Sequence, residues 1–150
     1  MKLILRSMLL VSIGLMACFQ GNAQTIINGG NVSGLWTKKN SPYQVNGDIT
    51  VAAGTTLEIE SGVTVTFAAG RGLTVNGQLL AEGTLSDGIV FTALNVSNYW
   101  SGLTINTTEG ENESVVKYAA IKYGYRQQQS GGGVCIIKGT ITLTNNTISN

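Results

Sequence analysis

The fold is decided by residues 49–91, which read ITVAAGTTLEIESGVTVTFAAGRGLTVNGQLLAEGTLSDGIVF. In this stretch a small or apolar residue recurs at every eighth position, at Ile49, Leu57, Val65, Leu73, Ala81 and Ile89. A second set lies two residues after the first, at Val51, Ile59, Phe67, Val75, Gly83 and Phe91. In most of these pairs, the residue between the two members is threonine or glutamate. This in–out–in alternation predicts short β-strands that each bury one face.

The eight-residue interval also runs through the corners between these strands. Gly54, Gly62 and Gly70 keep the same spacing, and glycine supplies the positive φ that a tight bend needs. An antiparallel sandwich also has frequent turns, but its hairpins do not require an unbroken register through successive corners. A solenoid does require it, because each corner stacks on an equivalent corner. We therefore predict an all-β, right-handed parallel β-helix with three eight-residue sides, or about 24 residues per coil.

The predicted strands define an inward-facing ladder in which equivalent residues of successive coils stack. Its members alternate with polar residues and are Leu57, Ile59, Val65, Phe67, Leu73, Val75, Ile89 and Phe91. We assign residues 43–150 to the β-helix and residues 24–42 to an N-terminal leader or cap. The last residues, TITLTNNTISN at 140–150, stop inside a repeat. We therefore expect the N-terminal portion of a longer solenoid, since natural solenoids carry caps.

Composition excludes several classes of protein. The 150 residues include no histidine, which rules out zinc sites and catalytic triads that depend on histidine. The net charge is +1 and there is no basic stripe, so we expect no nucleic-acid partner. The apolar content of 43% fits a packed core and not a disordered chain.

Residues 1–23 are typical of a secretory signal peptide. Lys2 and Arg6 precede a short apolar run, and Gly21-Asn22-Ala23 supplies small residues for cleavage. The apolar run is too short to span a bilayer, so we expect a secreted or cell-surface protein without a transmembrane span. The alternative is a lipoprotein anchored through Cys18, which follows Leu15-Met16-Ala17.

Removal of the signal peptide leaves Cys135 as the only cysteine. No intramolecular disulfide is then possible, and the domain depends on its core and its hydrogen bonds. We interpret Cys135 as a small buried apolar residue, because no histidine is present to activate its thiol.

The acidic residues do not form a recognisable catalytic pair. Glu58 and Glu60 lie two residues apart on one strand, which places them ~6.6–7 Å apart, close to the separation in inverting glycosidases. Both alternate with buried residues, however, so we expect them to face water. We assign no catalytic residue. Calcium is the cation to consider at Glu109, Glu111 and Glu113, but the spacing favours a solvated acidic loop, and we assign no metal site or cofactor.

The aromatic residues are the remaining candidates for a binding site. An aromatic face suits the apolar side of a sugar ring, and the candidates for glycan contact are Tyr99, Trp100, Tyr123 and Tyr125. The alternative for Trp100 is packing at a coil corner. We expect Trp36 to close the N-terminal end of the core, and Asn145 and Asn146 to form an asparagine ladder on stacked turns.

Several segments together resemble one family. SPYQVNGDITVAAGTTLEIESGVTVTFAAGRGLTVNGQLLAEGT at 41–84, followed by Ile89-Val-Phe-Thr92, is similar to the opening of secreted bacterial right-handed parallel β-helix proteins of the pectin-lyase-like fold. VVKYAAIKYG at 115–124, GGGVCI at 131–136 and LTNNTIS at 143–149 resemble the repeats of that family. The family includes polysaccharide lyases, glycoside hydrolases and adhesins.

In lyases of that fold, a basic residue abstracts the proton, usually near calcium-binding aspartates. Lys117, Lys122 and Arg126 are the bases available here, and Asp48 and Asp87 are the aspartates, far from them in sequence. We interpret the lysines as outward charges that keep the sheet soluble.

These observations favour a non-catalytic, monomeric β-helix that acts as a binding or scaffold module. Its expected partner is an extended polysaccharide or a surface glycan. The alternative is the N-terminal part of a polysaccharide lyase or glycoside hydrolase whose catalytic coils follow residue 150. For residues 1–150 themselves we expect no enzymatic activity.

Overall fold

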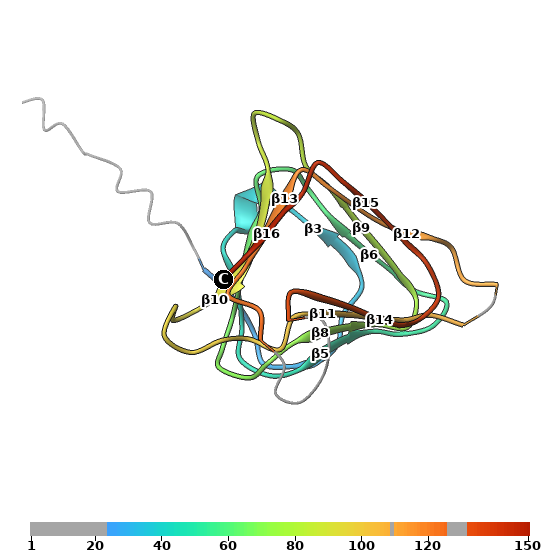
Figure 1. Ribbon diagram of the computed structural model, residues 1–150, viewed down its shortest axis with the longest axis horizontal. Coiled ribbons are helices and arrows are strands. Elements are labelled where there is room, and N and C mark those ends of the chain that lie inside the picture. The colour runs from blue at the N-terminus through green and yellow to red at the C-terminus, as the bar shows by residue number, and fades with distance from the viewer. Residues whose placement is uncertain (1–23, 109, 126–131) are drawn as a thin grey trace, which may run out of the picture.

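The computed structural model describes residues 24–108, 110–125 and 132–150, which form sixteen strands, one short 3-10 helix (η1, Lys38–Asn40) and their connections. The strands build a parallel β-solenoid of about four turns, and Figure 1 shows its three sheets as the sides of a triangle. All pairings between the strands are parallel, which confirms the predicted solenoid and excludes an antiparallel sandwich. The predicted signal peptide, residues 1–23, lies outside the described residues, as do Glu109 and Arg126.

The three sheets take every third strand of the chain. Sheet A contains β1 (Thr25–Ile27), β4 (Tyr43–Val45), β7 (Thr64–Phe67), β10 (Ile89–Ala93), β13 (Ala119–Lys122) and β16 (Thr147–Ser149). Sheet B contains β2 (Gly30–Asn31), β5 (Ile49–Val51), β8 (Leu73–Val75), β11 (Leu103–Asn106) and β14 (Val134–Lys138). Sheet C contains β3 (Gly34–Trp36), β6 (Thr56–Ile59), β9 (Gln78–Glu82), β12 (Ser114–Lys117) and β15 (Ile141–Thr144). Strands β1 to β3, in the predicted leader segment, thus pair with the coil that follows them.

The coils are less uniform than the predicted length of 24 residues. Ile49 pairs with Leu73, a step of 24, but Leu57 pairs with Leu79, a step of 22, and the average turn is about 26 residues. Because these two steps differ by an even number of residues, Leu79 and Ala81 both point inwards, whichever of them pairs with Leu57. The inward direction could therefore be predicted more accurately than the pairing.

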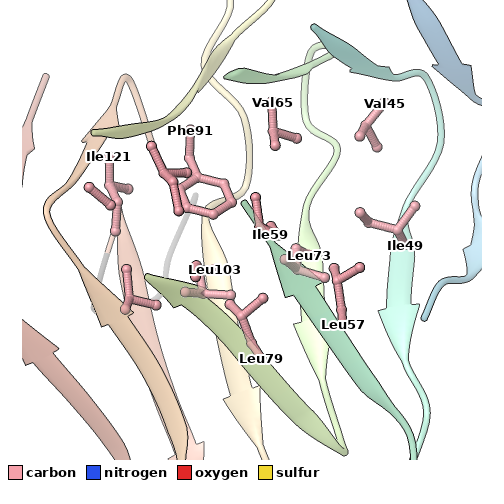
Figure 2. Close-up of a cluster of buried hydrophobic side chains, with 14 of the residues drawn as sticks. Val45, Ile49, Leu57, Ile59, Val65, Leu73, Leu79, Phe91, Leu103 and Ile121 are labelled. Atoms are coloured by element: carbon pink, nitrogen blue, oxygen red, sulfur yellow. The ribbon is translucent and has the colours of Figure 1, made fainter. Parts of the chain in front are cut away.

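The core fills the triangle. All eight residues of the predicted ladder are at most 2% exposed, and Figure 2 shows several of them pointing into the space between the sheets. The corners follow the prediction too, because Gly54, Gly62 and Gly70 have φ values of 73°, 77° and 68°. These φ values lie in the left-handed region, where glycine is favoured because it has no Cβ.

The two ends of the solenoid differ. In the first coil, Trp36 is buried and its ring stacks on Tyr43, with centroids 4.4 Å apart. In the last coil, three residues continue the core columns above buried partners, yet they are 40–53% exposed: Ile136, Leu143 and Ile148. Within the described part of the chain, no further strand pairs with the outer edges of β14, β15 and β16.

Cys135 differs from its predicted environment. It is half-buried, not buried, and pairs with Thr104 on β11, between the inward-facing neighbours Val134 and Ile136. The alternation of the strand therefore directs its side chain to the outer face of sheet B. Among the described residues, no helix is long and apolar enough to cross a membrane.

Candidate functional site

The predicted aromatic candidates lie together at one corner of the triangle. Sheet A ends there and the chain turns into sheet B, and we call residues 94–102 with 123–125 the A–B corner. Residues 94–102 follow β10, and residues 123–125 follow β13 on the next coil. Trp100 and Gly124 are bridged as parallel neighbours, which brings the two segments side by side.

Tyr99 and Tyr125 form the exposed part of this corner. Their exposed fractions are 46% and 54%, and their ring centroids lie 5.5 Å apart with an interplanar angle of 46°. The pair joins residues that are 26 positions apart, on successive coils. Two tilted aromatic rings at this separation provide a broad apolar contact with polar hydroxyl tips, which suits a ring that is itself partly apolar.

Trp100 does not belong to the exposed surface, which corrects its selection as a glycan contact. Its side chain is fully buried, and its ring stacks on Phe67 with centroids 4.2 Å apart. The indole Nε1 donates a hydrogen bond to the carbonyl of Lys122 at 2.8 Å. The alternative, packing at a coil corner, describes this residue. Tyr123 is partly buried and packs against the core, so it offers less surface than Tyr99 or Tyr125.

Backbone hydrogen bonds hold the two tyrosines in place. The Trp100 amide donates to the Tyr123 carbonyl at 3.2 Å, and the Tyr125 amide donates to the Trp100 carbonyl at 2.8 Å. The buried Trp100 side chain lies between these bonds and anchors the corner to the core. The tyrosines are therefore positioned by regular solenoid structure, which lowers the entropic cost of binding.

A charged pair lies on the neighbouring coils. Arg71 Nη1 lies 3.2 Å from Asp48 Oδ2, and the two side chains are 48% and 65% exposed. The Gly70 amide donates to the Tyr99 carbonyl at 2.9 Å, which connects this pair to the A–B corner. Sequence reasoning missed Arg71. A spacing of 23 residues between Asp48 and Arg71, close to one coil, is the signal that relates them.

The other ionisable candidates are dispersed. Glu58 lies on the outer face of sheet C, and Glu60 Oε2 accepts a hydrogen bond from the Lys38 amide at 2.8 Å. Lys117 forms an ion pair with Glu82 at 2.8 Å. Lys122 lies exposed at the end of β13. These groups do not meet around a common centre.

The acidic residues considered for calcium also bind separate partners. Glu111 accepts from the Gly54 amide at 3.0 Å, whereas Glu113 accepts from the Thr142 hydroxyl at 2.7 Å. Among the described residues, no group of three or more potential metal ligands is found.

Asn146, one of the two residues of the predicted asparagine ladder, forms hydrogen bonds with backbone groups of the neighbouring coil. Asn146 does not stack on another asparagine; its side chain accepts from the Ala119 amide and donates to the Val116 carbonyl, both at 2.8 Å. An asparagine contact between coils is instead made by Asn106, whose Nδ2 donates to Asn76 Oδ1 at 3.2 Å.

Comparison with known proteins gives one partial relative. The chain is 38% identical over 81 residues to the Drosophila melanogaster protein called Protein bark beetle, a match that covers 52% of this chain and 3% of that protein. The match thus spans only a small fraction of that relative's length. No family model matches the chain. No solved structure matches it either.

Proposed function

We propose that this chain is a non-catalytic binding module whose A–B corner contacts an extended glycan. The observation that carries the proposal is the pair of half-exposed tyrosines, Tyr99 and Tyr125, held 5.5 Å apart on a corner that is anchored by a buried tryptophan. Aromatic side chains offer a large contact area for the apolar face of a sugar at low conformational cost.

The polar neighbours support the same kind of ligand. The Asp48–Arg71 pair on the adjoining coils offers a carboxylate and a guanidinium for hydrogen bonds to hydroxyl groups. Because the two charges offset each other, this pair adds no net charge to the corner. The combination of an apolar platform with a few fixed polar groups is typical of small-molecule and carbohydrate sites.

The arrangement of the acids and bases supports a non-catalytic role. General acid–base chemistry needs two groups that converge on one bond. Here Glu60 accepts a hydrogen bond from a backbone amide, and Lys117 is paired with Glu82. Arg71, which the Gly70 amide connects to the A–B corner, is likewise paired, with Asp48.

The test is a binding screen of the full chain and two variants against a glycan array that includes pectin, alginate, glycosaminoglycans, xylan, mannan and cellulose fragments. We expect Tyr99→Ala and Tyr125→Ala each to weaken binding of the glycans retained by the parent chain by about tenfold or more, equivalent to ~1.4 kcal/mol. Leu35→Ala is the matched control, because Leu35 is an exposed apolar residue on β3 of sheet C, away from this corner.

Two results would overturn the proposal. One is a parent chain that retains no glycan on the array. The other is tyrosine variants that bind as well as the Leu35→Ala control. Appearance of an unsaturated product during incubation with pectin or alginate would show a lyase, and so would contradict the non-catalytic role.

We also propose that the module works outside the cell after loss of residues 1–23. The small residues at Gly21-Asn22-Ala23 and the preceding apolar run support this. Mass spectrometry of the N-terminus of the exported protein is expected to begin at Gln24. A lipid-modified Cys18 as the first residue would establish the anchored alternative.

A further inference from the structure

A hollow lies at the ends of β10 and β13 that are opposite to the tyrosines. It is a surface pocket of about 340 Å³ at the corner where the chain passes from sheet C into sheet A. We call it the C–A pocket and define it by six of its lining residues: Thr84, Leu85, Tyr118, Ala120, Asn145 and Thr147. Its volume lies at the lower end of the range of ligand pockets, ~300–1,000 Å³.

The wall of the C–A pocket is a fixed turn. The Asp87 carbonyl accepts hydrogen bonds from the Gly62 and Thr84 amides, both at 3.1 Å, and the Asp87 carboxylate pairs with Lys38 of the first coil. A Cβ atom at Gly83 or Gly88 would lie 2.8 Å from the Tyr118 carbonyl oxygen, so this loop lies directly against the next coil. The pocket is therefore built from the stacking of successive coils.

The lining of the pocket selects a class of ligand. It contains no charged side chain. Thr84, Tyr118 and Thr147 carry hydroxyl groups and Asn145 carries an amide, while the other lining side chains are apolar. Neutral hydrogen-bonding groups beside apolar carbons match an uncharged, polyhydroxylated ring better than a carboxylate or phosphate.

The same two strands join the C–A pocket to the A–B corner. β10 begins at the pocket with Ile89 and runs into the segment that carries Tyr99. β13 begins there with Ala119 and runs towards Tyr125 past the outward-facing Lys122, whose ammonium group can donate hydrogen bonds to sugar hydroxyls. Figure 1 shows loops projecting at both ends of β10. From Ala120 to Tyr125 the chain advances five residues, or ~16 Å if extended.

The geometry points to one continuous binding face on sheet A. We infer that an uncharged oligosaccharide lies across the outer face of sheet A, along β10 and β13, with one sugar in the C–A pocket and another on Tyr99 and Tyr125. This inference rests on the proposed function and adds the charge and the direction of the glycan. The ligand then runs parallel to the strands and does not follow the solenoid axis.

The experiment measures affinity by calorimetry for xylo-, manno- and cello-oligosaccharides of two to six units. Three variants alter the pocket: Thr147→Val removes a hydroxyl, Asn145→Gly removes the amide and keeps the positive φ of 55°, and Ala120→Phe fills the space. Thr74→Val is the matched control, because Thr74 is a half-buried outward threonine on sheet B.

We expect affinity to rise at least tenfold between the disaccharide and the longest oligomer of the series that binds. The pocket variants should lower the affinity for that oligomer at least fivefold, while Thr74→Val leaves it unchanged. The affinity for the disaccharide should be lowered either by the tyrosine variants or by the pocket variants, but not by both.

The outcomes separate the two proposals. Affinity that is independent of length, or pocket variants that bind as the parent does while the tyrosine variants fail, would overturn the sheet A inference and leave the proposed function standing. Tighter binding of uronic-acid oligomers than of all three neutral series would overturn the charge assignment and with it this inference. If no series and no array glycan binds, the proposed function fails first.

Discussion

The coils of the regular region, residues 43–82, differ from those of the looped region, residues 83–150. Within the regular region, paired residues of successive coils are 22 to 24 positions apart. Pairings that reach into the looped region take 26 to 35 positions, the longest being Ala81 with Val116. Extra residues enter at corners, as expected for solenoids, because the strands must keep their register while loops need not.

This difference suggests a division of roles, in which the regular region provides stability and the looped region provides the binding surfaces. The regular region has tight glycine corners and supplies most of the ladder that closes the core. The looped region carries both candidate binding surfaces, the aromatic A–B corner and the C–A pocket. Connections that project from a rigid scaffold are where binding residues are generally found. The following experiments test this division, beginning with the largest expected effect.

Removing a ring from the regular region should have the largest effect on stability. Phe67 is fully buried and its ring stacks on Trp100, so the core of the regular region extends under the A–B corner. We expect Phe67→Ala to lower the free energy of unfolding by ~3–5 kcal/mol, measured by urea denaturation. A loss below about 1 kcal/mol, comparable to that of an exposed residue, would show that the register is wrong.

Truncating two stacked residues in the looped region should lower the free energy of unfolding by unequal amounts. Ile121 and Ile148 are register partners on sheet A, but Ile121 is buried and Ile148 is half exposed in the last coil. We expect Ile121→Ala to cost ~2–5 kcal/mol and Ile148→Ala at most about 1 kcal/mol. Equal losses in urea denaturation would mean that the last coil is as tightly covered as the one beneath it.

A methyl group at a tight corner of the regular region should be harmful although it adds apolar volume. Gly77 lies between β8 and β9, and a Cβ there would collide with the carbonyl oxygens of Ala52 and Thr55. We expect Gly77→Ala to cost ~1–3 kcal/mol, because backbone atoms must shift. Asn112→Ala, in an exposed loop of the looped region, should change stability by less than ~0.5 kcal/mol. Thermal melts of both variants compare the two kinds of corner.

The ion pairs should contribute least. Lys117 and Glu82 connect the two regions on sheet C, but both side chains are more than a third exposed. Screening by water then limits the gain, and we expect Lys117→Met to change stability by no more than ~1 kcal/mol, with the difference decreasing in high salt. A larger, salt-independent loss would mean that this pair is essential to the join between the regions.

The sequence predicted the inward side chains well because alternation is a local property. Leu57 and Phe67 are buried whatever their partners are. The pairing could not be predicted, because it depends on how many residues each corner takes up. A uniform coil of 24 places Leu57 on Ala81, whereas the two-residue corner at Asn76 and Gly77 places it on Leu79.

The candidate site could be predicted only in part, because its contacts also depend on the lengths of the corners. Tyr99 and Tyr125 were identified as aromatic candidates, but their contact depends on a connection whose length the repeat does not specify. Trp100 was grouped with them because all three residues share a chemistry. The burial of Trp100 follows from its stacking on Phe67. This contact depends on the path of the corner and cannot be predicted from the spacing of residues in the sequence. The C–A pocket, assembled from three coils, has no sequence signature.

The two tryptophans give the molecule a built-in optical readout. Trp36 stacks on Tyr43 in the first coil and Trp100 stacks on Phe67 two coils further on, and both indoles are shielded from water. Each should emit at short wavelength when folded and shift to the red when its own coil opens. Single-tryptophan variants would then report separately on each coil during denaturation. Coincident fluorescence transitions would identify one cooperative unit, whereas separated transitions would show the order in which the coils come apart.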